Sequence, residues 1–261
     1  MIEIKGIGSY DSIPELASYV IDENINMLDE ELSRGLDLDE EIKFSKYVSL
    51  SPLALALIMN KEKSVKWLVE KGADLNDEEN PSFILAVRYC DEPIIRYLVS
   101  HGAKINVLNR VDSDAFEQAL YGGKIENLAL IDELGHSVKK YGGPAFRKAV
   151  SEGNYEALEF FIARGVDINY NRADNVYSFC PTPLCVATRY VDLKMCKYLV
   201  EHGADVTITE KDGMRPYSIA VEKGDMEMAD YFKTLEPEDF HNIKNKLYEL
   251  KAYKLPKSLL E

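Results

Sequence analysis

Five alanines in this chain each stand 16 residues before a glycine. The pairs are Ala56 with Gly72, Ala86 with Gly102, Ala119 with Gly135, Ala149 with Gly165, and Ala187 with Gly203. The stretch from one glycine to the next alanine is not fixed and varies between 14 and 22 residues. A rigid block joined by connections of variable length is typical of two packed helices followed by a loop. The sequence therefore predicts a stack of helix–turn–helix units.

Residue types inside the block agree with two helices. Prolines stand at the expected start of the first helix in four blocks, at positions 52, 144, 183 and 216. Proline is tolerated there because its missing N–H would have no helical partner anyway. A residue suited to a left-handed turn follows the alanine by four positions in four blocks, as Asn60, Gly123, Gly153 and Gly224. Cys90 and Val191 occupy this place in two others, which predicts that those two turns differ.

The glycines that end the blocks recur from Gly35 to Gly203 with a mean spacing of 33.6 residues. This period, the run Thr182-Pro183-Leu184 with Ala187, and the run from Gly72 to Asn76 resemble the ankyrin repeat. The resemblance implies an all-α solenoid of helix–turn–helix units with connecting loop fingers, about seven units over residues 14–236. It is weaker in the first unit, and the seventh has Glu236 where the final glycine is expected, which suits a terminal capping unit.

Two segments lie outside the repeat. Residues 1–13 form an N-terminal extension to which the sequence assigns no structure. Residues 237–261 are expected to form a C-terminal capping helix, over 238–253, and a tail, because apolar residues recur there at three- and four-residue steps. A partner-binding helix is the alternative for this last segment.

The composition limits the classes of binding partner and the cellular compartment that we expect for this chain. The net charge is −14, and residues 1–50 alone carry 12 acidic and 4 basic residues. Nucleic acid and anionic membranes are therefore poor partners. The first residues do not resemble a signal peptide, the longest apolar run has seven residues, and four cysteines make no disulfide framework. We expect a cytoplasmic monomer.

A search for reactive motifs finds no phosphate-binding glycine loop, catalytic serine motif or metalloprotease motif, so no enzyme activity and no cofactor is predicted. His101 and His202 stand in the expected last turn of a helix and are interpreted as capping residues. His136 has no acidic or cysteine cluster near it in the sequence. A metal or ligand site at Cys180, Cys185 and Cys196 is kept as an alternative, although their spacing fits no common zinc finger.

Binding in the family that the chain resembles uses the loop fingers and the exposed side of each first helix. The resemblance therefore implies a protein–protein interaction module with another protein as its partner, or alternatively an inhibitor or immunity-type protein that blocks an enzyme or toxin. Tyrosine and arginine, the types that dominate binding hot spots, are common at these positions. The predicted contact residues are Arg88, Tyr89, Tyr121, Arg189, Tyr190, Tyr47, Tyr141, Tyr177 and Phe179.

Overall fold

The structure, a computed structural model, describes residues 2–5, 7–174 and 176–236. Within these ranges fourteen helices follow one another along the chain as seven pairs, and the chain divides into two compact units, Met1–Tyr141 and Gly142–Glu261. The capping helix predicted over 238–253, and the tail after it, lie outside the described residues.

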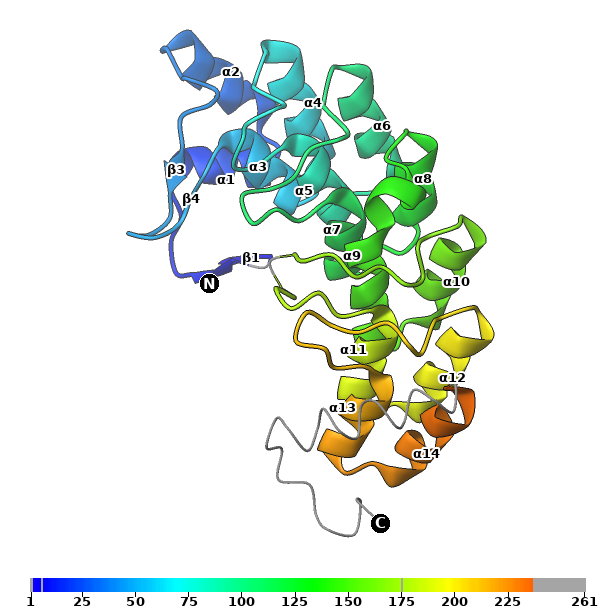
Figure 1. Cartoon of the computed structure of the whole chain (residues 1–261). Coiled ribbons are helices and arrows are strands. Elements are labelled where there is room, and N and C mark those ends of the chain that lie inside the picture. Colours follow the sequence, from blue (N-terminus) through cyan, green and yellow to red (C-terminus); the bar gives the residue numbers. More distant parts are fainter. Residues whose placement is uncertain (1, 6, 175, 237–261) are drawn as a thin grey trace. The chain divides into compact units, whose positions relative to one another are not determined.

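Four helix pairs make up most of the first unit (Figure 1). They are α1 (Glu15–Ile21) with α2 (Ile25–Ser33), α3 (Pro52–Ile58) with α4 (Glu62–Lys71), α5 (Ser82–Tyr89) with α6 (Glu92–Ser100), and α7 (Ala115–Tyr121) with α8 (Asn127–Glu133). We call the first helix of each pair the inner helix and the second the outer helix. Within this unit each inner helix packs against its own outer helix, and successive inner helices pack against each other from α1 to α7. This is the stacked arrangement that the fixed alanine–glycine interval predicts.

Two short hairpins in the first unit are absent from the sequence prediction. Strand β1 (Ile2–Ile4) pairs antiparallel with β2 (Gly8–Tyr10), and β3 (Ile42–Lys43) pairs with β4 (Ser49–Leu50) in the finger before α3. Ile4 is fully buried, so the first hairpin is anchored to the repeats although it precedes them. Strands of two or three residues are too short for an alternating pattern to reveal.

The second unit contains the remaining helices. After α9 (Val138–Ser151), which begins just before the unit boundary, come α10 (Tyr155–Ala163), α11 (Pro183–Arg189), α12 (Leu193–Glu201), α13 (Pro216–Lys223) and α14 (Met226–Leu235). The sequence predicted that the inner helix of the fifth pair starts at Pro144. It begins at Val138 instead and runs through Gly142, Gly143 and Pro144.

A tertiary contact accounts for this departure. A Cβ atom on Gly143 would lie 2.4 Å from the ring of Tyr170, so only glycine allows that ring to pack against the helix. Contact with the aromatic ring offsets the poor helix propensity of glycine, a type of compensation that no local pattern can reveal.

Small residues set the spacing of the inner helices. The alanines that define the repeat, together with Ala220 of the seventh pair, are all buried, with no more than 1% of their surface exposed. Gly122, just after α7, shows how close the approach is: a Cβ atom there would lie 2.0 Å from the carbonyl oxygen of Arg88. The backbone of the α7–α8 pair thus comes close to the backbone of the α5–α6 pair.

The turn between inner and outer helix is left-handed in six of the seven pairs of the described chain. The residues with positive φ at this turn are Glu23, Asn60, Gly123, Gly153, Val191 and Gly224. Cys90 is extended instead, with φ −109° and ψ 169°, so the prediction that its turn differs is confirmed. The same prediction is wrong for Val191, whose φ of 57° puts a β-branched residue in a conformation that normally suits glycine or asparagine.

We predict that Gly122→Ala lowers the free energy of unfolding by about 3 kcal/mol, because the added methyl group must displace the backbone of Arg88. Gly123→Ala is the matched control. Its φ is +67° but nothing lies within 4 Å of the added Cβ, so the loss there should be near 1 kcal/mol. Urea unfolding measures both, and equal losses would contradict the close backbone approach.

We also predict that Val191→Gly raises the free energy of unfolding by about 1 kcal/mol, since the strain relieved exceeds the entropy that glycine adds to the unfolded chain. Asn60→Gly is the control, because asparagine already tolerates a left-handed backbone and little should change. Thermal and urea unfolding report the difference. A less stable Val191→Gly variant would show that the valine packs well enough to offset its strain.

Candidate partner-binding surfaces

Two tyrosines and an arginine form one group on the inner helices of the first unit. The guanidinium of Arg88 lies over the ring of Tyr89 at 5.1 Å and over the ring of Tyr121 at 5.8 Å. Its Nη1 also donates a hydrogen bond to Oε1 of Gln118 at 2.9 Å, which ties α5 to α7. Tyr121 keeps 48% of its surface exposed. The three predicted residues therefore lie together, and the arginine holds the two rings in place.

The finger tips of the first unit add exposed apolar side chains. Tyr47 lies between β3 and β4 and is 86% exposed, with the ammonium of Lys46 over its ring at 5.4 Å. Leu108 and Val111, in the finger before α7, are also exposed. Sequence reasoning did not single out these two, because a search for aromatic and charged residues passes over aliphatic ones.

Tyr141 has a different environment from the one expected. It lies on α9, not in a finger, and its ring stacks on the imidazole of His136 at 4.2 Å with an interplanar angle of 8°. His136 is buried, with Nδ1 3.0 Å from Oδ1 of Asn106 and Nε2 3.8 Å from the carboxylate of Asp114. Asp114 is thus a single acidic neighbour of His136, 22 residues away in the sequence but beside it in the fold, and it makes no acidic or cysteine cluster.

A buried arginine organises the longest loop, over residues 166–182 in the second unit. Arg147 of α9 is fully buried, and its Nη1 donates to the carbonyl oxygens of Arg172 at 2.9 Å and Pro181 at 3.1 Å. The same guanidinium pairs with the carboxylate of Asp174 and lies 5.2 Å from the ring of Tyr177. The loop thus has a fixed internal support. Its sequence signal is weak, since an arginine inside a helix usually faces solvent.

Three apolar side chains of the second unit are conspicuously exposed. Val176 is 61% exposed in the supported loop, and Tyr190 and Val191 at the end of α11 are 62% and 49% exposed. Burial and the adjacent hydroxyl of Tyr190 raise the pKa of Tyr177 to about 12, which places this loop directly against the inner helix. Tyr177 thus lies against Tyr190, and exposed apolar side chains are found both in the loop and at the end of the helix.

Arg189, by contrast, has a buried partner. Its Nε donates to Oε1 of Glu210 at 3.2 Å, and its guanidinium lies 5.1 Å from the ring of Phe179. Glu210 is 2% exposed, and desolvation raises the pKa of its carboxyl group while Arg189 opposes that rise. Arg189 thus neutralises a buried charge and joins two fingers to α11, whatever it contributes to binding.

The cysteines do not come together as a metal site. Cys185 and Cys196 are buried, and desolvation raises the pKa of each thiol to about 12, so both stay protonated at neutral pH. No group of three or more histidine, cysteine, aspartate or glutamate residues in the described ranges could hold a metal ion. His101 and His202 each place Nδ1 2.8 Å from a carbonyl oxygen of the last helical turn, which confirms their capping role.

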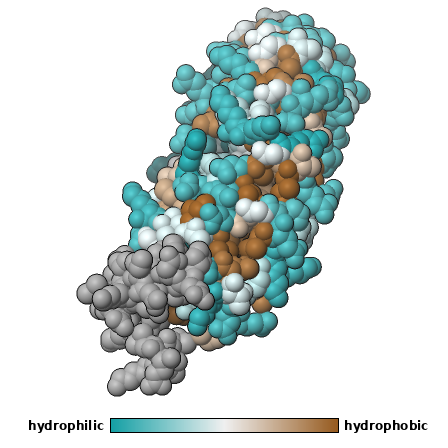
Figure 2. All heavy atoms as spheres, turned by 45° about the vertical axis from the view of Figure 1, so that its right-hand side comes forward, coloured by the Kyte–Doolittle hydropathy of each residue, from teal (hydrophilic) through white to brown (hydrophobic). Residues whose placement is uncertain are grey.

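Most of the surface visible in Figure 2 is hydrophilic, and hydrophobic residues are confined to patches between the hydrophilic areas. None of the helices in the described part of the chain is both long enough and apolar enough to span a bilayer.

Comparison with known proteins agrees with this architecture. A family model described as "Ankyrin repeats (3 copies)" matches residues 15–109 and 146–242. The chain belongs to the ankyrin-repeat family. As an ankyrin-repeat protein it has the all-α repeat fold that the sequence predicted, supplemented by two small hairpins.

Several ankyrin-repeat relatives are similar over part of their length. A fowlpox virus ankyrin repeat protein is 26% identical over 56% of this chain and 31% of its own length. Alpha-latrocrustotoxin-Lt1a of Latrodectus tredecimguttatus is 27% identical over 52% of this chain and 10% of its own length. A second fowlpox virus ankyrin repeat protein is 25% identical over 65% of this chain and 91% of its own length. This chain thus spans less than a third of the first two relatives.

We predict that Arg189→Ala costs about 2–3 kcal/mol of stability at pH 8 and less at pH 5. Without the arginine, the pKa of Glu210 rises further above its value in the unfolded chain. A raised carboxyl pKa means that the folded state binds the proton more readily, so stability falls as the pH rises through the folded pKa.

The double variant Arg189→Ala with Glu210→Gln is the control for this effect. It removes the titrating group, so urea unfolding at the two pH values should show the same loss relative to wild type. A loss in Arg189→Ala that does not change with pH would show that Glu210 is not the cause.

Proposed function

We propose that this ankyrin-repeat protein is a non-catalytic interaction module that binds a protein partner through its inner helices and loop fingers. Ankyrin repeats are generally protein–protein interaction modules. The observation that carries the proposal is the exposure of large side chains at the positions that such contacts would use, above all Tyr121, Tyr190 and Tyr47.

Tyrosine at these positions has a physical reason. Its ring contributes a large apolar area, its hydroxyl remains able to hydrogen-bond, and it has only two side-chain torsions to immobilise. The arginine that packs on Tyr89 and Tyr121 restrains both rings further, which reduces the entropy lost on binding. Tyr190 has a comparable neighbour in Tyr177, which is itself packed on Arg147.

The compartment and the assembly state are part of the same proposal. All four cysteines are free thiols, and the two described above are kept protonated by burial, which suits a reducing cytoplasm. The net charge of −14 favours a soluble monomer over self-association and disfavours nucleic acid as a partner.

Site-specific photocrosslinking tests this proposal. We predict that p-benzoylphenylalanine in place of Tyr121, or in place of Tyr190, captures a protein from a lysate of the source organism, because each residue lies at the end of an inner helix and is exposed. Mass spectrometry identifies what is captured, and the alanine variants of each tyrosine should lose affinity for it by at least tenfold.

Met226 is the matched control position for the crosslinking. It is an exposed large apolar residue of the second unit but lies on the outer helix α14, so the same photoreactive group there should capture nothing specific. Capture from position 226 alone would place binding on the outer helices and contradict the proposal. The melting temperature of each variant confirms that it is folded.

A further inference from the structure

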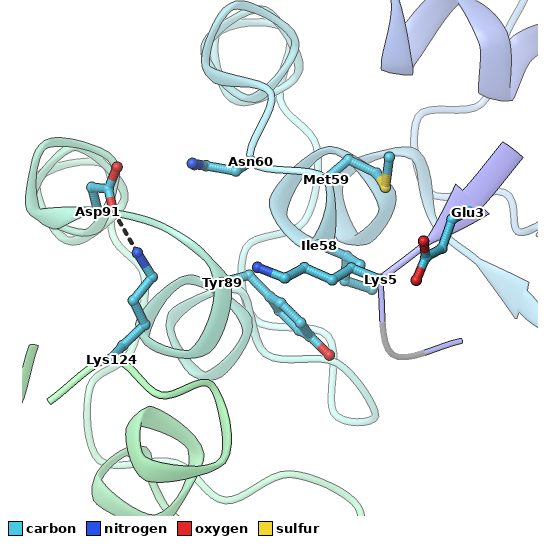
Figure 3. A pocket seen from close by; sticks show the side chains of 8 residues that line it. All are labelled: Glu3, Lys5, Ile58, Met59, Asn60, Tyr89, Asp91 and Lys124. Atoms are coloured by element: carbon cyan, nitrogen blue, oxygen red, sulfur yellow. Dashed lines mark hydrogen bonds and ion pairs between the residues drawn. The ribbon is translucent and has the colours of Figure 1, made fainter. Parts of the chain in front are cut away.

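A pocket of about 420 Å³ opens beside strand β1 in the first unit (Figure 3). Its walls come from β1, from the end of α3, from the end of α5 and from the turn after α7, which are distant in sequence. Pockets of this size accommodate a side chain together with its flanking backbone. The N-terminal extension, to which the sequence assigned no role, therefore forms one wall of a cavity on the predicted binding side of the second and third pairs.

The two lysines that line the pocket differ in whether they have an acidic partner. Lys124 pairs with Asp91 at 2.7 Å and with Glu126 at 3.5 Å, so its charge is neutralised. Lys5 makes no ion pair within the described residues. In Figure 3 its side chain reaches from β1 across the pocket toward Tyr89, whereas Glu3 lies on the side away from Asp91 and Lys124. Lys5 is thus a lining cation whose side chain extends over the pocket without an ion pair to the described residues.

The rest of the lining is apolar or neutral. Ile58, Met59 and the ring of Tyr89 form the apolar part, and the amide of Asn60 supplies further hydrogen-bonding groups. The guanidinium of Arg88 over the ring of Tyr89 adds a second positive charge nearby. An occupant that matches these groups has a single negative charge on a short apolar stem.

We propose that this pocket binds the acidic side chain, aspartate or glutamate, of an extended segment of the partner protein. The carboxylate would contact the ammonium of Lys5, and the neighbouring residue of the segment would pack on Tyr89 and Met59. A basic side chain is disfavoured because it would meet Lys5. A phosphate is disfavoured because Lys5 balances one negative charge, and the second would meet the carboxylate of Glu3.

The inference deepens the proposed function and rests on it, because the acidic segment belongs to the partner. It also explains how a chain with a net charge of −14 can recognise an acidic group. Four charged side chains of opposite sign line the pocket, two acidic and two basic, so attraction is local to Lys5 and does not act at long range.

The test uses two tripeptides on the full chain, acetyl-Ala-Glu-Phe-amide and its neutral isostere acetyl-Ala-Gln-Phe-amide, followed by ¹H–¹⁵N NMR. The glutamate peptide should bind about tenfold more tightly, as a charge-assisted contact allows. Its shifts should concentrate at the backbone amides of residues 3–5, 58–60 and 89–91. Lys5→Gln should abolish the preference for glutamate, whereas Lys63→Gln, an exposed lysine of the same unit outside the pocket, should preserve it.

Equal affinities for the two peptides, or shifts outside the pocket, would overturn the proposal. Tighter binding of acetyl-Ala-phosphoserine-Phe-amide than of the glutamate peptide would also overturn it and identify a phosphate site instead. These results are independent of crosslinking from Tyr121 and Tyr190, which does not involve Lys5. If the peptides do not bind in the pocket, the proposed interaction module is unaffected. The crosslinking experiment tests that module separately.

Discussion

In the first unit successive inner helices approach closely, and small residues lie where they meet. The repeat alanines are buried for this reason, and at Gly122 even a methyl group would collide with the backbone of the preceding pair. Such close packing fixes the distance from inner helix to outer helix and from one pair to the next, because interiors tolerate no added volume. Insertions are therefore possible only in the fingers. The sequence shows this directly as a constant 16-residue interval flanked by connections of variable length.

Fingers that vary in length must be held by other means, and in the second unit arginines serve this purpose. Arg147 binds carbonyl oxygens of the long loop, Arg189 pairs with Glu210, and Arg215 donates to Oε2 of Glu236 at 2.9 Å. Buried ion pairs add little net stability, but removing one partner is costly. They therefore act chiefly to select one loop conformation. Glu236, which replaces the expected final glycine, has a clear role as the partner of Arg215.

The parts of this fold that sequence reasoning predicted depend on residues close in the chain. Helix starts at proline and left-handed turns after the alanine follow from local backbone preferences, and most were confirmed. The failures depend on contacts between distant residues. The inner helix α9 begins before Pro144, and at Gly143 it packs against the ring of Tyr170, a contact that no local pattern reveals. The Lys5 pocket was missed for the same reason, whereas the two hairpins were missed because their strands are too short to show an alternating pattern.

Residue type alone also could not separate binding residues from supporting ones. Arginines at equivalent positions of α5 and α11 were predicted as contacts of the same kind, yet one supports two tyrosines and the other neutralises a buried glutamate. The end of α11 differs in two ways: a β-branched residue has a left-handed backbone, and neighbouring apolar side chains are exposed. Val191 has a strained backbone without the burial that would offset it, and it follows the exposed Tyr190.

Residues whose backbone conformation does not suit their type concentrate at functional sites, because elsewhere they only lower stability. At the equivalent turn, four other pairs have glycine or asparagine, which adopt this backbone easily. A valine there is only half buried, so it contributes less to the core than a buried valine would. Its side chain adds apolar surface next to the exposed Tyr190, and the binding partner that we propose would cover it. The strain at Val191 thus supports the same surface that the exposure of Tyr190 identifies.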